Sequence, residues 1–200
     1  IVERHAVRDV DLLARIVRYA ATNIGRTFSA SSIAKFFKSE HRAVAPETIL
    51  NYLAACTESF LLYRIPRQDL AGKKILTVNE KYYLADHGLR TPIDGQSATA
   101  IDQTLENIVC LELLRRGYRV TVGKTGTQEI DFVCDRQKER IYVQVAYLLA
   151  TEETINREFG AYKNVRDNYP KYVISMDPVD LSRDGILHKN IMEFLCMERY

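Results

Sequence analysis

Apolar and polar residues recur with the period of a helix through the first 60 positions. From Asp9 or Asp11 to about Asn23, the apolar residues follow the 3, 4, 7 spacing of a helix that buries one face. The same spacing predicts a helix over 31–38 and another from Pro46, since proline suits a first helical turn. Three such helices predict a compact bundle. Its inward residues are Leu12, Leu13, Ile16, Val17, Ala20, Ile33, Phe36, Phe37, Ile49, Leu50, Leu53 and Ala54.

After residue 60 the pattern changes to that of strands. Residues 61–65, 74–78 and 82–84 are rich in β-branched and aromatic side chains, and a turn-prone segment, 69–72, separates the first two. Helix, helix, helix, hairpin is the order of a winged helix. In that fold the third helix enters the major groove of DNA and the hairpin lies along the phosphates.

The charges of this first part leave two interpretations open. The predicted third helix, from Pro46 to Phe60, contains Glu47 and Glu58 but no Lys or Arg. Contact with DNA would therefore depend on cations outside it, and the alternative is docking against a protein or another part of the same protein. The candidate nucleic-acid contacts are Arg42, Arg64, Arg67, Lys73 and Lys74.

The second part reads as a small α/β domain. A segment with proline, glycines and small polar residues, 86–99, suggests a junction, so we expect domains at 1–90 and 91–200. Beyond it, the pattern predicts a helix over 101–116 with Gly117 as its cap, and strands at 118–122, 128–134, 141–147 and 171–176. Helices are predicted over 152–167 and 187–198. This order favours a mixed sheet with helices on both faces.

Composition narrows the class of protein but not its function. The 46% apolar content suits one large core or two modest ones, and the net charge of +2 divides into +4 for residues 1–100 and −2 for 101–200. The four cysteines have no metal-ligand spacing, which favours reduced, apolar residues of a cytoplasmic protein. The four histidines read as surface or boundary residues. No apolar run is long enough for a membrane span.

Three residues of the second part have the spacing of a nuclease metal site. Glu106 lies in an apolar helix, so its charge needs an ion or a partner such as Arg115 or Arg140. Alternation in the strands places Asp131 and Gln144 on one side if the strands form a hairpin. Two carboxylates and a main-chain oxygen could hold Mg²⁺, and such an ion could activate water for phosphodiester cleavage. Gln144 offers a neutral oxygen, which is a poorer ligand. Ala146 stands where such a site needs a lysine.

The same stretches resemble a known family. Glu106-Asn107, the segments 112–118, 129–133 and 142–147, and Arg157-Glu158-Phe159 are similar to the C-terminal region of prokaryotic AAA-type ATPases. The resemblance implies a P-loop ATPase module, then a winged-helix-like segment, then a restriction-endonuclease-like PD-(D/E)XK core. This chain has no P-loop motif, so ATP binding is implied only for a preceding module absent from the sequence.

The resemblance also frames the functional hypotheses. The nuclease pattern is matched at Glu106 and Asp131 but not at Gln144 and Ala146. We therefore expect a non-catalytic binding or regulatory module that contacts DNA, a protein partner or its own ATPase module, through which it could also oligomerise. The alternative is a metal-dependent endonuclease that uses Glu106 and Asp131, with the lysine supplied from elsewhere, as by Lys124, Lys138 or Lys163.

Overall fold

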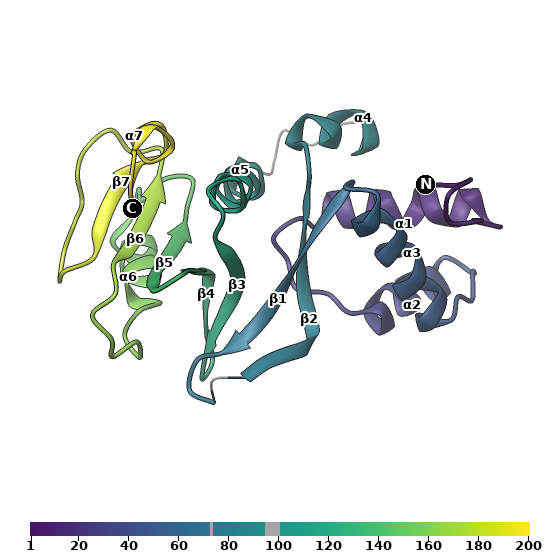
Figure 1. The fold of residues 1–200 in the computed structure, drawn as a ribbon, viewed down its shortest axis with the longest axis horizontal. Coiled ribbons are helices and arrows are strands. Elements are labelled where there is room, and N and C mark those ends of the chain that lie inside the picture. Colours follow the sequence, from purple (N-terminus) through teal and green to yellow (C-terminus); the bar gives the residue numbers. More distant parts are fainter. Residues whose placement is uncertain (73, 95–100) are drawn as a thin grey trace. The chain divides into compact units, whose positions relative to one another are not determined.

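The chain divides into two compact units (Figure 1). The computed structural model describes residues 1–72, 74–94 and 101–200. The first unit comprises Ile1–Ile65 and Thr77–Thr99, and the second comprises Pro66–Leu76 and Ala100–Tyr200. The division therefore differs from the expected one at 90–91. The tip of the hairpin counts with the second unit because Arg67 to Asp69 pair in parallel with a strand there.

Three helices build the first unit. α1 (Val10–Thr22) begins at Asp9, whose carboxylate accepts the Leu12 N–H at 2.9 Å. α2 (Ala30–Ser39) begins with a capping box, in which the side chains of Ser29 and Ser32 each accept the other's backbone N–H. α3 (Pro46–Glu58) has proline in its first turn. Their buried faces confirm most of the predicted core, although Phe36, Leu50 and Ala54 are exposed.

A hairpin follows the helices, formed by β1 (Leu62–Asp69) and β2 (Lys74–Leu84). Phe28, between α1 and α2, forms an antiparallel bridge with Glu80 of β2. Its ring stacks on Tyr82 with centroids 5.1 Å apart. The segment expected to be a linker instead begins with the 3₁₀ helix η1 (His87–Leu89) and α4 (Arg90–Asp94).

The second unit is built on a mixed sheet, as the sequence predicted. Its strands are β3 (Arg119–Thr125), β4 (Gln128–Arg136), β5 (Glu139–Val145), β6 (Lys171–Ser175) and β7 (Leu187–Asn190). The order is β1-β3-β4-β5-β6-β7. The β3–β4 and β4–β5 pairs are antiparallel, whereas β1–β3, β5–β6 and β6–β7 are parallel.

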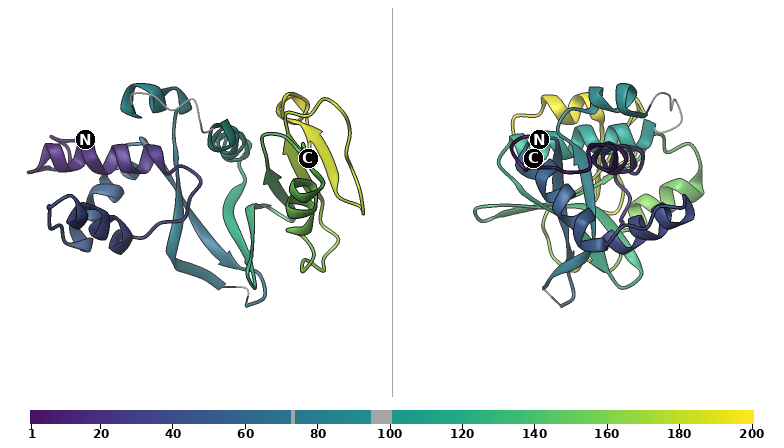
Figure 2. Two further views of the ribbon diagram at one scale, coloured as in Figure 1. Left: turned by 180° about the vertical axis from the view of Figure 1, so that it is seen from behind. Right: turned by 90° about the vertical axis from the view of Figure 1, so that its right-hand side faces the viewer.

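Helices cover both faces of this sheet. α6 (Glu152–Gly160) packs Ile155 and Phe159 into an apolar cluster that includes Val173 of β6. The preceding residue of β6, Tyr172, points to the opposite face and contacts Phe194 of α7 (Ile191–Cys196), with ring centroids 6.1 Å apart. The green helix α6 and the yellow helix α7 can be followed in Figure 2. α5 (Ile101–Arg115) lies near α7, since Arg116 at its end donates to the Leu195 carbonyl at 3.1 Å.

Two expectations for the C-terminal part are corrected. The predicted helix over 187–198 is a short strand, β7, followed by the one-and-a-half turns of α7. As a result His188 is not at the surface: it is only 2% exposed. The cysteines, by contrast, are free, and three of the four are buried. No helix in the described ranges has the length and apolar character of a membrane span.

Candidate functional site

A bulge in β4 places the first of the predicted site residues. Thr121 pairs with Val133 and Gly123 with Ile130, so two residues of β4, Asp131 and Phe132, stand opposite one residue of β3. Gly123 permits this close approach, because a Cβ on it would lie 2.7 Å from Val133 Cγ2 and 3.1 Å from Ile130 Cβ. The bulge interrupts the ladder at Asp131.

Side chains replace the ladder bonds at this interruption. The Asp131 N–H donates to Oε1 of Gln144 at 3.1 Å, and the Val145 N–H donates to Oδ2 of Asp131 at 3.0 Å. Asp131 and Gln144 thus lie next to each other on neighbouring strands, as expected, but Gln144 is bonded onward to α6 and not toward the helix that holds Glu106, where the sequence had directed it. Each satisfies a backbone group that the bulge would otherwise leave without its strand partner.

The polar contacts continue from β5 to α6. Nε2 of Gln144 donates to Oε2 of Glu158 at 2.9 Å, and Arg157 donates to Oε1 of Glu158 through Nε at 2.9 Å and lies within 2.7 Å through Nη2. Asp131, Gln144, Glu158 and Arg157 thus form a continuous hydrogen-bonded chain, called here the bulge network. It runs from the sheet to the surface, where Arg157 is 70% exposed.

The bulge network holds a buried carboxylate. Glu158 is 5% exposed, and burial raises its pKa above the usual value although the bonds from Gln144 and Arg157 oppose that shift. The negative charge of Asp131 raises it further. In return, the bond to Glu158 raises the pKa of Arg157. A buried, perturbed carboxylate marks this as the candidate site of the second unit.

The other predicted site residues are placed as follows. Glu106 is half-buried on α5, a helix that contacts β3, β4 and β5. The two arginines suggested as its partners pair elsewhere: Arg115 with Glu112 at 2.7 Å and Arg140 with Asp135 at 2.7 Å. Ala146 is 5% exposed and belongs to the apolar cluster under α6.

Mg²⁺, which the carboxylates Glu106 and Asp131 led us to expect, gains no ligand from the Gln144 side chain as it stands. Gln144 already accepts a backbone N–H with its oxygen, and its nitrogen faces Glu158 as a donor. Among residues 1–72, 74–94 and 101–200, no group of three or more His, Cys, Asp or Glu side chains is placed to hold a metal ion. The geometry is that of an internal polar connection.

Sequence reasoning missed Glu158 and Arg157 as members of this site. Both belong to the segment Arg157-Glu158-Phe159 that carries the resemblance, but no function was predicted for either. A signal was present, since Glu158 follows Ile155 by three positions in a helix and so shares its inward face. A carboxylate on an apolar helical face requires a partner.

Two of the five candidate nucleic-acid contacts are engaged within the fold. Arg42 donates to Asp9 at 2.6 Å and to Asp11 at 2.5 Å, and the Asp11 bond raises the pKa of its guanidinium. Arg67 is bound to Glu129 at 2.9 Å and is 14% exposed. The three remaining candidates differ: Arg64 is 59% exposed and 3.9 Å from Glu80, Lys74 is exposed, and Lys73 lies outside the described residues.

A second buried polar group lies beside β6 and β7. Nε2 of His188 is 2.9 Å from the Ser175 hydroxyl, and that hydroxyl donates to Asp177 at 2.7 Å. The Leu181 N–H donates to Nδ1 at 3.2 Å, which places the ring proton on Nε2. In this tautomer Nε2 cannot take a proton from Ser175, so the trio is structural rather than a nucleophile and base.

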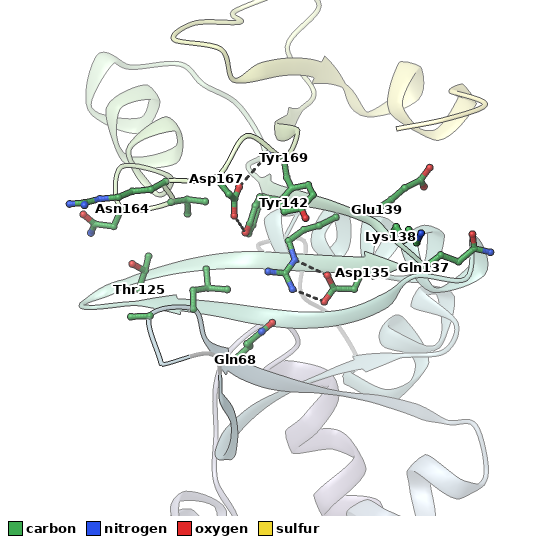
Figure 3. Close-up of a pocket in the computed structure, with 15 residues that line it drawn as sticks. Gln68, Thr125, Asp135, Gln137, Lys138, Glu139, Tyr142, Asn164, Asp167 and Tyr169 are labelled. Carbon is green, nitrogen blue, oxygen red and sulfur yellow. Dashed lines mark hydrogen bonds and ion pairs between the residues drawn. The ribbon is translucent and has the colours of Figure 1, made fainter.

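A polar cavity of about 540 Å³ opens on the face of the sheet that carries α6 (Figure 3). Its floor includes Asp135, which binds Arg140 through both carboxylate oxygens at 2.7 and 3.0 Å. Its wall includes Tyr142, whose hydroxyl donates to Asp167 at 2.5 Å. Lys138, one of the lysines considered for the nuclease alternative, lines it, whereas Glu106, Asp131 and Gln144 do not.

The chain belongs to the family defined by a domain of unknown function, DUF8612, whose model matches residues 1–100. An uncharacterized protein of Haemophilus influenzae is 37% identical over 177 residues, which are 88% of this chain and 43% of the relative. An uncharacterized protein of Methanocaldococcus jannaschii is 27% identical over 173 residues, 84% of this chain and 38% of the relative. The chain thus spans about two fifths of either relative's length. No solved structure matches it.

Proposed function

We propose that this chain is a non-catalytic binding module of a longer protein and that its partner is a protein rather than DNA. One observation carries the non-catalytic part: Gln144 stands where a nuclease needs a carboxylate ligand, and both ends of its amide are bonded inside the fold. A residue that connects Asp131 to Glu158 in this way contributes to stability and presents no group to a substrate.

The longer protein that we propose is an ATPase of the AAA type. The order of elements in the first unit, with the added bridge at Phe28, is that of a winged helix, and α5-β3-β4-β5-α6-β6 is the order implied by the resemblance to a nuclease-like core. Relatives more than twice as long as the matched region leave room for the P-loop module. ATP would be bound in that module.

The charges of the first unit favour a protein partner. α3 carries no Lys or Arg, and Arg42 neutralises carboxylates of its own unit. Arg67, at the hairpin tip that counts with the second unit, is likewise bound to Glu129. A phosphate contact at either arginine would have to replace a charge-assisted hydrogen bond already made. Large apolar side chains are exposed instead, with Leu50 of α3 at 51% and Phe60 directly after it at 73%.

A fluorescence anisotropy titration tests the choice of partner. Short labelled DNA duplexes are mixed with the chain at low and at moderate salt concentration. We expect no binding that weakens steeply with salt, because α3 carries no Lys or Arg and the guanidinium groups of Arg42 and Arg67 are already bonded to carboxylates. The variant Lys74→Ala should behave like wild type. Salt-sensitive binding that Lys74→Ala and Arg64→Ala reduce would overturn the protein assignment in favour of a wing that contacts phosphates.

A DNA cleavage assay tests the endonuclease alternative, in which Glu106 and Asp131 are metal ligands. If the bulge network is structural, substitution of Asp131 changes stability and no hydrolytic activity exists to be lost. If the chain cleaves DNA in the presence of Mg²⁺ or Mn²⁺, and Asp131→Ala abolishes cleavage, the non-catalytic proposal is wrong.

A further inference from the structure

The polar cavity of the second unit has the dimensions of a small-molecule site. Its volume of about 540 Å³ lies within the roughly 300–1,000 Å³ typical of ligand pockets. Four separate segments line it: the end of β1 with its following turn, Thr125 of β3, the β4–β5 turn, and the loop over 164–169. In Figure 3, Asn164 and Thr125 lie toward one end of the cavity and Lys138 and Gln137 toward the other.

The carboxylates of this cavity are neutralised by the protein. Burial acts to raise the pKa of Asp135, but hydrogen bonds from Arg140 and Arg119 outweigh it and hold that pKa below the usual range. Asp167 accepts the Tyr142 hydroxyl and lies 3.5 Å from Lys171. Glu139 is bound to Arg136 at 2.9 Å. The negative charges of these three carboxylates are therefore already balanced by cations of the protein, and the cavity does not require a bound cation.

The cations that line the cavity differ in whether they pair with an acidic side chain. Lys138 in the β4–β5 turn and Arg166 in the 164–169 loop line it and are exposed. Within the described part of the chain, neither side chain has a hydrogen bond or ion pair, whereas every acidic lining residue has one. The cavity thus presents a surplus of positive charge, which an anion would complement.

The remaining lining groups suit a planar polar ring. The Gln68 oxygen accepts from Thr121 and the Asn164 nitrogen donates to Gln128, which leaves the Gln68 nitrogen as a donor and the Asn164 oxygen as an acceptor, both of which the edge of a nucleobase can use. Tyr169 also lines the cavity and is 44% exposed, and its N–H donates to Asp167, which fixes its backbone. An exposed aromatic face of this kind can stack on a base.

We propose that this cavity binds a nucleoside phosphate, with the base against Tyr169 and the amides and the phosphate at Arg166 or Lys138. The site is distinct from the bulge network and does not depend on the chain being catalytic or inert. Neutral amides, one exposed ring and unpaired cations together select a ligand that is both aromatic and anionic. An inorganic anion or an uncharged base would satisfy only part of the lining.

Isothermal titration calorimetry with the full chain tests this site, using AMP, ADP, ATP, GTP and inorganic phosphate as separate probes. We expect a nucleotide to bind with a dissociation constant below about 1 mM and inorganic phosphate to bind at least tenfold more weakly. Arg166→Ala and Tyr169→Ala should each weaken nucleotide binding about tenfold or more. The matched controls are Lys163→Ala and Tyr147→Ala, which remove an exposed cation and an exposed ring that do not line the cavity.

Three outcomes would overturn the proposal. The first is the absence of nucleotide binding by a chain whose circular dichroism shows it to be folded. The second is equal affinity for phosphate and nucleotides, which would reduce the site to a simple anion contact. The third is equal loss of binding in Lys163→Ala and Arg166→Ala, which would mean that general surface charge and not this cavity attracts the ligand.

Discussion

At the scale of single residues, the bulge network explains why position 144 is a glutamine, which the nuclease pattern leaves unexplained. Gln144 is neutral, so it can donate to the buried Glu158 and accept from the Asp131 N–H at once. A glutamate at this position would place two carboxylates side by side, and it would have no proton to donate at neutral pH. The amide is therefore suited to connecting the strand to α6.

Replacing Gln144 by alanine should destabilise the second unit. The substitution removes one partner from the Asp131 N–H and one from the buried Glu158, and loss of a partner to a buried polar group costs about 1–3 kcal/mol. Urea unfolding followed by circular dichroism measures the change. Asn168→Ala, which truncates an exposed amide, should stay within about 0.5 kcal/mol of wild type. Equal stability of both variants would contradict the structural role.

His188 should make stability depend on pH. Burial lowers its pKa from the usual 6.5, although Asp177, Asp180 and Glu193 oppose that shift. The unfolded chain therefore takes up a proton near pH 6.5 that the folded chain resists, so the free energy of unfolding should fall as pH falls below about 6.5. Above that pH the contribution is constant.

Unfolding at about pH 7.5 and about pH 5.5 measures this effect, since the two conditions lie on either side of the usual histidine pKa. The fall in stability between them should be smaller in His188→Gln than in wild type, whatever the absolute stability of the variant. His87→Gln is the control, because His87 is exposed. If the free energy of unfolding falls by the same amount in His188→Gln as in wild type, groups other than His188 cause the pH dependence.

At the scale of elements, the helices were predictable and the irregular strands were not. The 3, 4, 7 spacing of Leu12, Ile16 and Ala20 locates α1 because one face is buried and the other is solvated. β7 was missed because it has four residues, three of them polar, and no alternation long enough to recognise. The Asp131–Gln144 contact followed from strand alternation, whereas Glu158 could be placed only once α6 was docked on the sheet.

Gly123 should be the glycine of this unit least tolerant of substitution. A Cβ there meets Val133 and Ile130 across the bulge, so Gly123→Ala should cost about 1–3 kcal/mol in the free energy of unfolding. Gly160 at the end of α6 has no atom within 4 Å of its added Cβ. Gly160→Ala should be neutral or stabilise by up to about 1 kcal/mol. The reverse ranking in denaturant unfolding would contradict the close packing at the bulge.

At the scale of the whole molecule, the hairpin tip belongs to the second unit. Residues 67–69 add a parallel strand beside β3, and Arg67 binds Glu129 of β4. A fragment of residues 101–200 exposes β3 as an unpaired edge and should melt several degrees below a fragment of residues 66–200. Differential scanning calorimetry compares them. Equal midpoints would show that β1 adds nothing to the sheet.

The account as a whole rests on the bulge network being structural, and a plasmid cleavage assay tests this most directly. Supercoiled plasmid is incubated with the chain and either Mg²⁺ or Mn²⁺, beside the Asp131→Ala variant and the control Lys35→Ala, which truncates an exposed lysine of α2. We predict that the plasmid stays supercoiled with all three proteins. Nicking by wild type and Lys35→Ala that disappears in Asp131→Ala would contradict the account, because Asp131 would then serve a reaction.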